Sequence, residues 1–248
     1  MAKYEKVIFI GDSHAPYEDN DCISSLLKFI RWFKPDKIFF LGDIVDFYAI
    51  SRFIRDPKKR LELQEEIDVG IDLIVKIKKV CPKKSELLFI RGNHEYRLQK
   101  FIWATSPELS GLRSLNFREL MMFDKLGIKY IEQGRMEYRG IVVKHGSVVR
   151  KYSGYSARAE FEKTGRSGVS GHTHRGAIYC ENKSGGEYKW MECGCLCKLD
   201  PEYMEGETPN WSQGWGIGYF KNNSKRFHLE FVPYVNGKAM YSGKEFSK

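Results

Sequence analysis

Short apolar runs alternate with amphipathic segments along the first half of the chain. Continuous apolar stretches are typical of strands buried on both faces, and here they occupy residues 7–10, 38–41 and 87–90. Between them, apolar residues recur at helical spacing over 23–33 and 63–77, and Asn20 or Asp21 is expected to cap the first of these helices. Strand–helix alternation predicts parallel strands joined by right-handed crossovers.

Strand patterns dominate after residue 127. We expect strands at 128–131, 141–144, 168–170, 177–180, 188–190, 215–220 and 227–232, with a hairpin turn at 184–186. The pattern predicts an α/β sandwich of two mixed β-sheets flanked by helices, formed by one domain over residues 1–236. Residues 95–127 are helical in pattern and rich in arginine and aromatic side chains, which suggests a cap inserted near a site. Residues 237–248 are expected to form a loose C-terminal tail.

Composition narrows the class of protein. The 248 residues are 42% hydrophobic and 14% aromatic, which fits a globular domain and argues against disorder. No apolar stretch of about 20 residues and no signal-peptide layout is present, so we expect a cytoplasmic protein without a membrane partner. The net charge of +9 favours a polyanionic partner such as DNA or RNA, although lysine-rich helix faces would give the same charge.

Three of the six cysteines cluster, at Cys193, Cys195 and Cys197. Alternate spacing would place all three on one face of a strand, where they cannot easily form disulfides with one another. We therefore expect reduced, mostly buried thiols. A thiolate metal site remains an open alternative, although no C-x-x-C pair supports it.

Five of the six histidines stand beside glycine-bounded turns that follow predicted strands, and the sixth, His228, is expected to be structural. The turns are Gly11-Asp12-Ser13-His14, Gly42-Asp43-Ile44-Val45-Asp46, Gly92-Asn93-His94-Glu95, His145-Gly146 and Gly171-His172-Thr173-His174. Carboxyl ends of strands in α/β sheets are where functional sites assemble, so these side chains are expected to converge.

The spacing within the turns suits metal ligands. Residues i and i+2 of extended backbone point to the same side, so Asp12 with His14, or His172 with His174, can face one cavity. Two neighbouring cations repel each other, and Asp43 is the natural carboxylate to bridge them. Mixed oxygen and imidazole ligands suit manganese, iron, zinc or nickel. Two metals about 3.5–4 Å apart can activate water and hold a phosphoryl oxygen.

The five motifs, D-x-H, G-D-x-x-D, G-N-H-[DE], an isolated histidine and G-H-x-H, occur in this order between residues 12 and 174. In this the chain resembles the calcineurin-like metallophosphoesterase superfamily. The resemblance implies a calcineurin-like sandwich, a metallophosphoesterase domain over residues 1–236, and two divalent metal ions per chain. Manganese is the first expectation, with iron, zinc or nickel as alternatives.

The resemblance also implies a role for each residue of the motifs. The first metal would be held by Asp12, His14 and His174, and the second by Asn93, His145 and His172, with Asp43 bridging them. His94 matches the histidine that protonates the leaving oxygen or binds phosphate, and Asp46 matches the carboxylate that orients it.

Some positions depart from related enzymes. Ser/Thr protein phosphatases carry Arg-Gly directly after the second aspartate of G-D-x-x-D, where this chain has Phe47 and Tyr48. These rings could face a base or a sugar, or pack into the core. Arg91, just before Gly92, does match those phosphatases and is a further candidate for binding substrate. Arg175 follows the last motif and could contact phosphate or lie on the surface.

The predicted reaction is in-line hydrolysis of a phosphate ester by water activated at the metals, with no covalent intermediate. A phosphodiester of nucleic acid or nucleotides, as in nucleases and phosphodiesterases, is favoured by the charge of +9 and by the arginine missing after Asp46. The alternative is a phosphomonoesterase resembling Ser/Thr protein phosphatases. A third, remote alternative is a catalytically silent interaction scaffold.

Overall fold

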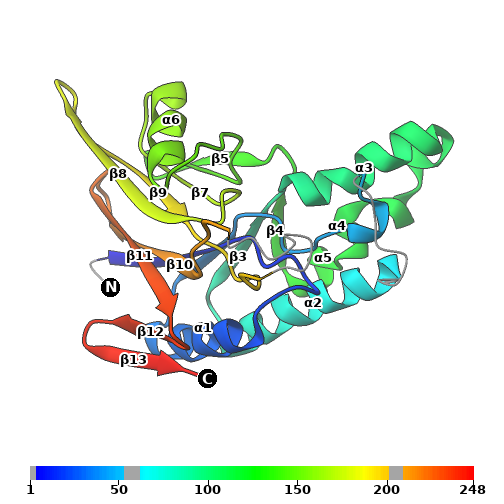
Figure 1. The fold of residues 1–248 in the computed structure, drawn as a ribbon, viewed down its shortest axis with the longest axis horizontal. Helices are drawn as coiled ribbons and strands as arrows, with labels where there is room; N and C mark the ends of the chain where they lie inside the picture. Colours follow the sequence, from blue (N-terminus) through cyan, green and yellow to red (C-terminus); the bar gives the residue numbers. More distant parts are fainter. Residues whose placement is uncertain (1–3, 53–61, 201–208) are drawn as a thin grey trace.

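Two β-sheets packed face to face lie at the centre of the molecule, with helices on both outer faces (Figure 1). The computed structural model describes residues 4–52, 62–200 and 209–248. Within these residues the larger sheet has eight strands in the order β13-β12-β11-β10-β1-β2-β3-β4. Their bounds are β1 (Tyr4–Ile10), β2 (Lys37–Phe40), β3 (Glu86–Ile90), β4 (Ile128–Ile131), β10 (Gly214–Lys221), β11 (Phe227–Val235), β12 (Lys238–Tyr241) and β13 (Lys244–Ser247).

The first four strands of the larger sheet are parallel, as the strand–helix alternation predicts, whereas β10 to β13 pair antiparallel. The smaller sheet has the order β5-β6-β7-β9-β8 and is also mixed. Its strands are β5 (Arg135–Tyr138), β6 (Ile141–Lys144), β7 (Gly168–Ser170), β8 (Gly176–Lys183) and β9 (Gly186–Cys193). The predicted α/β sandwich of two mixed sheets flanked by helices is confirmed.

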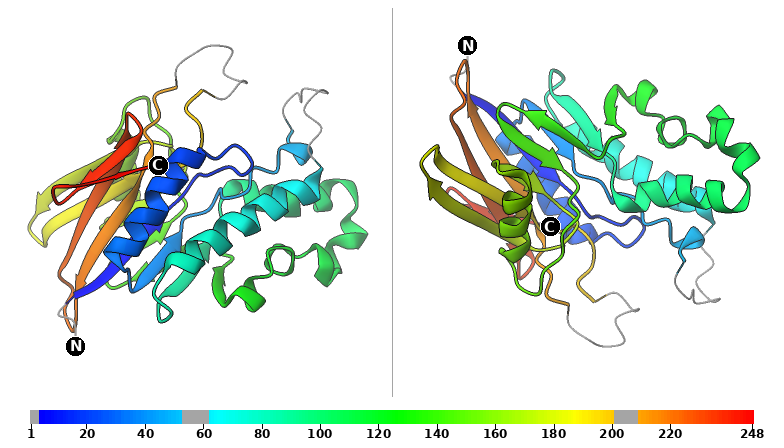
Figure 2. Two further views of the ribbon diagram at one scale, coloured as in Figure 1. Left: turned by 90° about the horizontal axis from the view of Figure 1, so that it is seen from below. Right: turned by 90° about the horizontal axis from the view of Figure 1, so that it is seen from above.

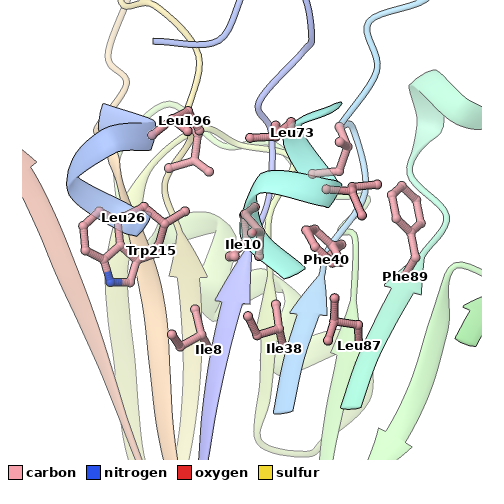
Figure 3. Close-up of a cluster of buried hydrophobic side chains, with 14 of the residues drawn as sticks. Ile8, Ile10, Leu26, Ile38, Phe40, Leu73, Leu87, Phe89, Leu196 and Trp215 are labelled. Atoms are coloured by element: carbon pink, nitrogen blue, oxygen red, sulfur yellow. The ribbon is translucent and has the colours of Figure 1, made fainter. Parts of the chain in front are cut away.

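Alternate residues of the central strands serve two different cores. Ile8 and Ile10 of β1 point to the face covered by α1 (Asn20–Phe33) and α2 (Leu63–Val80), where Figure 3 shows them beside Leu26 and Leu73. Val7 and Phe9 point the other way and pack between the sheets. On the far side, α6 (Tyr155–Thr164) covers the smaller sheet, as the two views of Figure 2 show. Because both faces of these central strands are covered, their sequences are continuously apolar rather than alternating.

The first helix begins one residue earlier than the sequence pattern suggests. The N-cap of α1 is Asp19, whose carboxylate accepts hydrogen bonds from the main-chain nitrogens of Asp21 at 2.9 Å and Cys22 at 3.0 Å. The prediction of Asn20 or Asp21 as the cap is therefore wrong. All three residues have suitable side chains, and the bonds to the first-turn N–H groups decide between them.

The segment 95–127 is largely helical. It contains most of α3 (Asn93–Thr105), followed by η2 (Pro107–Gly111), η3 (Arg113–Leu115), α4 (Phe117–Leu120) and α5 (Phe123–Leu126). A short helical turn outside the segment, η1 (Tyr48–Ile50), contacts α3. Because α3 begins at Asn93, its first turn carries motif residues. That this segment caps the site stays a prediction.

The C-terminal residues are not a loose tail, contrary to the expectation for 237–248. β12 and β13 extend the larger sheet and lie against α1 (Figure 1). The Phe246 ring is 3% exposed and lies 5.2 Å from the Phe29 ring, and Ser25 Oγ donates a hydrogen bond of 2.6 Å to the Phe246 carbonyl. One buried aromatic residue anchors a segment whose local sequence carries no strong strand signal.

The clustered cysteines do not share one strand face as expected. β9 ends at Cys193, which packs between the sheets, and Gly194 then adopts a left-handed φ of 68°. A Cβ at Gly194 would lie 2.5 Å from the Ser212 carbonyl oxygen, so the turn depends on glycine. Cys195 and Cys197 follow outside the strand, and all six cysteines are free thiols.

Candidate metal centre

The motif turns of both sheets meet at one place. Asp12, Asp43 and Asn93 follow β1, β2 and β3 of the larger sheet, and His145 and His172 follow β6 and β7 of the smaller one. The Asp12 carboxylate accepts a hydrogen bond of 3.0 Å from the His172 main-chain nitrogen, and His145 Nδ1 donates to the Leu41 carbonyl at 2.9 Å. These bonds tie the strand ends of the two sheets together.

The ligand turns are left-handed rather than extended, which corrects the i, i+2 argument. Positive φ angles occur at Asp12 (55°), His14 (48°), Asp43 (51°), His172 (71°) and His174 (56°). Such angles are uncommon for residues other than glycine, cost about 1–3 kcal/mol each and gather at functional sites. The paired side chains still converge, but through tight turns whose strain the surrounding structure must offset.

The first group of candidate ligands is Asp12, His14 and His174, whose donor atoms all lie within 4.8 Å of one another. His14 Nε2 lies 2.9 Å from His174 Nε2, and His174 Nε2 lies 3.4 Å from Asp12 Oδ1. All three residues are buried. Imidazole nitrogens and a carboxylate facing one point in this way fit a divalent cation.

The second group gathers around His145 Nε2. Asn93 Oδ1 lies 2.9 Å away, His172 Nδ1 3.1 Å and Asp43 Oδ2 3.2 Å. Asp43 also forms a group with His14 and His94 whose donor atoms lie within 4.8 Å. It therefore stands between the two sets of ligands, where a bridging carboxylate is expected, and the residues present fit two cations.

Burial alone would raise the pKa of Asp43, but the imidazoles of His145 and His94 outweigh it and hold the pKa well below its usual range. The carboxylate is thus anionic in a buried position, where it needs positive charge nearby.

His94 and Asp46 contact each other mainly through the main chain. His94 Nδ1 lies 2.6 Å from the Asp46 carbonyl oxygen, whereas the Asp46 carboxylate lies 2.9 Å from Nδ1 of His14 and 3.5 Å from Nδ1 of His94. A carbonyl can only accept, so Nδ1 of His94 carries the proton and Nε2 is left as an acceptor. Asp46 thereby positions two histidines, and its carboxylate acts chiefly on His14.

Arg97 is a site residue that the sequence analysis did not single out. Its Nη2 lies 3.2 Å from His94 Nε2, and its Nη1 donates to the carbonyl oxygens of Asp46 at 3.1 Å and Phe47 at 3.2 Å. The usable signal is helical spacing, because Arg97 lies four residues after Asn93 in α3 and therefore on the same side of the helix.

Comparison with known proteins agrees with this geometry. The family model for calcineurin-like phosphoesterases matches residues 5–176, more than half of the chain. The chain belongs to this family. The resemblance drawn from the motifs is therefore confirmed.

Two phage proteins are similar to this family member over nearly its whole length. The Gene 54 protein of Mycobacterium phage D29 is 25% identical, covering 96% of this chain and 97% of its own. The Gene 54 protein of Mycobacterium phage L5 is 24% identical, with 97% and 98% covered. Among solved structures, Vacuolar Protein Sorting 29 from Cryptosporidium parvum has a TM-score of 0.51 at 16% identity, covering 100% of both chains, which supports the fold alone.

Glu95, the last residue of the G-N-H-E motif, holds one of the ligand turns of this family member. Its buried carboxylate accepts hydrogen bonds from the main-chain nitrogens of Asp43 at 2.9 Å, Ile44 at 2.8 Å and Gly92 at 2.8 Å. Burial and the neighbouring Asp43 carboxylate raise the pKa of Glu95 to about 7. The motif contains Glu95 but does not reveal this role, because the bonds to Asp43 and Ile44 join residues 52 and 51 positions apart.

Two of the suggested substrate-binding side chains pack against aromatic rings of the protein. Phe47 is fully buried and packs against Phe117, with ring centroids 5.9 Å apart, so it cannot stack on a base. The Arg91 guanidinium stacks on Tyr96 at 4.0 Å and donates to Gln99 at 3.3 Å. The suggestion for Phe47 is wrong because its ring is buried in the core, whereas a substrate contact of Arg91 stays a prediction.

The other two suggestions have partners of their own. The Tyr48 ring is half-buried and lies 6.2 Å from that of Tyr17. Arg175 donates to the carbonyl oxygens of Arg150 and Asn210, the latter at 2.9 Å, so its guanidinium ties two loops together. A contact with phosphate stays a prediction for both.

A cavity of about 640 Å³ opens beside the ligand cluster. Asn93 and Arg97 form part of its wall, together with the cationic side chains of Arg52 and Lys100 and the ring of Phe101.

In the described residues, no helix is long and apolar enough to span a bilayer.

Proposed function

We propose that this protein is an enzyme that hydrolyses phosphate esters with two divalent metal ions, and that its substrates are phosphodiesters of nucleic acid or nucleotides. The observation that carries the proposal is the arrangement of two ligand groups that share Asp43, with His94 and Arg97 beside them. Family membership supports phosphoester chemistry, and the donor set supports the metals.

Each candidate ligand has a place in this proposal. Asp12, His14 and His174 would hold one ion, Asn93, His145 and His172 the other, and Asp43 both. Manganese is the first candidate for this mixture of oxygen and imidazole ligands, with iron, zinc and nickel as alternatives. When bound, two such ions lower the pKa of water and offset the charge of phosphoryl oxygens.

His94 and Arg97 would act on the substrate side. The Asp46 carbonyl fixes the proton of His94 on Nδ1, so only Nε2 can face a substrate. An entering phosphoryl oxygen would take hydrogen bonds from the planar guanidinium of Arg97, which now contacts Nε2. To protonate the leaving oxygen, His94 would first take up a proton from solvent on Nε2 and pass it on as the ester bond breaks, returning to the form with its proton on Nδ1. The attacking water would release its own proton to solvent as its oxygen bonds to phosphorus.

The cavity beside Asn93 supports a phosphodiester. Three cationic side chains, those of Arg52, Arg97 and Lys100, line it, and they suit a backbone that carries more than one phosphate. Phe101, which is 43% exposed, offers a ring for a base. A volume of about 640 Å³ lies within the range of small-ligand sites.

A second candidate, phosphomonoester hydrolysis, is favoured by Arg97 itself. The sequence argument for diesters depended partly on the lack of an arginine after Asp46, because a dianionic monoester needs cationic groups beyond the metals. Arg97 supplies such a group from α3, and its Nη1 contacts the Asp46 carbonyl directly. The case for diesters therefore depends on the cavity and the overall charge.

The test compares kcat/KM on bis-p-nitrophenyl phosphate and p-nitrophenyl phosphate with added Mn²⁺. Single-stranded DNA, RNA and cyclic nucleotides are then tried at low and moderate salt. A diester preference with salt-sensitive cleavage of a nucleic acid is the expected result. A clear monoester preference without nucleic-acid cleavage would favour the phosphatase. No turnover by protein that holds two metals per chain would favour the scaffold.

A further inference from the structure

A group of thiol and imidazole donors lies next to the metal centre. A ring nitrogen of His174 and the Sγ atoms of Cys195 and Cys197 all lie within 4.8 Å of one another. Their residues are 9%, 0% and 4% exposed. Neither cysteine has a role in phosphoester hydrolysis as proposed above.

The polar atoms of this group are poorly satisfied by the protein. Nδ1 of His174 is buried and, among residues 4–52, 62–200 and 209–248, finds no hydrogen-bond partner. The Sγ atom of Cys195 makes a long contact of 3.7 Å with the Ser212 carbonyl oxygen, and the neighbouring polar group of its own cluster is the Cys197 thiol. Buried polar groups are normally paired, so an unpaired imidazole nitrogen beside two thiols indicates a missing partner.

The backbone holds the donors in place. The Ser212 main-chain nitrogen donates to the His174 carbonyl at 2.7 Å, and the Ser212 carbonyl accepts from Cys195 N at 3.0 Å. Leu196 N donates to the Asp12 carbonyl at 3.1 Å, and Gln213 Nε2 donates to the Cys197 carbonyl at 2.9 Å. Leu196, between the two cysteines, is thereby fixed to the turn of Asp12, and residues 212 and 213 hold the main chain of all three donors, so the group is preorganised.

We propose that His174, Cys195 and Cys197 form a third cation site, selective for a thiophilic ion such as Zn²⁺ or Cu⁺. Soft thiolate ligands select such ions, whereas the neighbouring centre offers only oxygen and imidazole ligands. Two sulfurs and one imidazole make a three-ligand set that leaves a fourth position for water or an anion. Each thiol that binds releases its proton to solvent.

The site would communicate with the phosphoesterase centre through His174. Nε2 of His174 lies 2.9 Å from His14 Nε2, on the side of the first ligand group. A neutral imidazole has one acceptor nitrogen, so His174 would serve both cations at once as an imidazolate, with its N–H proton released to solvent. The third site itself does not depend on the proposed hydrolysis, because its ligands include two residues outside the family motifs.

The experiment uses Cd²⁺ as a thiophilic probe on the full chain kept reduced by a phosphine. Cadmium bound to sulfur gives an ultraviolet sulfur-to-metal absorption band that cadmium bound to oxygen and nitrogen does not. The wild type should show this band, and Cys195→Ser/Cys197→Ser should lose it together with one bound cadmium per chain. Cys81→Ser and Cys180→Ser are matched controls that should retain both, since these cysteines lie at the end of α2 and in β8.

Asp43→Asn separates this proposal from the hydrolase function. That variant should lose metals of the phosphoesterase centre but keep the sulfur band. A band of equal strength in the double cysteine variant, or no band in the reduced wild type, would overturn the third site. If the double variant does not fold, cadmium NMR of the wild type decides, because a thiolate-bound ion resonates far downfield of ions held by oxygen and nitrogen alone.

Discussion

Arg97 and His94 lie three residues apart on α3, with Nη2 of Arg97 3.2 Å from Nε2 of His94. The pair places a permanent cation beside the imidazole nitrogen that faces the proposed substrate. Arg97 is also held from behind, since its Nη1 donates to the carbonyl oxygens of Asp46 and Phe47. A guanidinium fixed in this way can bind phosphoryl oxygens without first losing much side-chain freedom.

Replacing Arg97 should weaken catalysis while leaving the metals in place. Arg97→Gln is expected to lower kcat/KM by about 10- to 100-fold, the range for losing a hydrogen bond to a charged group. The loss should be larger for monoesters, which carry more negative charge. Arg118→Gln is a matched control, because Arg118 is exposed on α4 and pairs with Asp124. Equal activity of the Arg97 and Arg118 variants would remove Arg97 from the site.

His94→Gln should retain two metals and lose about 10²–10⁴-fold in turnover, the usual contribution of a general acid or base. The loss should shrink for nitrophenyl esters, whose leaving groups need little protonation. Rates on alkyl and nitrophenyl esters check this directly. If both fall equally, the acid role fails and phosphate binding becomes the better assignment for His94.

Asp43→Ala should remove metal as well as activity. Both ligand groups contain this carboxylate or lie next to it, so both ions would lose their shared anion. Elemental analysis of the purified protein measures the metal bound per chain. Asp68→Ala, on the exposed side of α2, is the control that should keep its metals. Two metals per chain in the Asp43 variant would contradict the bridge.

Phe246→Ala should destabilise the protein by about 3–5 kcal/mol, as expected for truncating a buried aromatic residue. Phe246 packs against Phe29 of α1 and is almost fully buried. The free energy of unfolding, measured by chemical denaturation, should hardly change for Met240→Ala, since Met240 is 59% exposed on the neighbouring β12. If the C-terminal segment is loose in solution, both substitutions should leave the free energy of unfolding nearly unchanged.

The candidate ligands could be named from the sequence because each belongs to a short motif placed directly after a strand. Asp12, Asp43 and Asn93 follow apolar runs that can only be buried strands, and parallel strands bring their carboxyl ends to one edge. The sandwich of two sheets followed from the same alternation. These features depend on the order of apolar and polar residues over short stretches, which can be read directly from the sequence.

Contacts between distant segments decided the rest. Phe47 and Arg91 looked available for substrate, but Phe117 and Tyr96 pack on them. The family resemblance paired the Asp46 carboxylate with His94, whereas the fold gives it chiefly to His14, 32 positions away.

Arg97, Glu95 and the thiols beside His174 depend on the fold in the same way. Each acquires its role from groups that only the folded chain brings within hydrogen-bond or ligand distance. The sequence by itself determined which side chains carry the chemistry and at which end of the strands they gather. Only the tertiary structure decided which partner each one meets, because a side chain's orientation depends on what packs around it rather than on its neighbours in sequence.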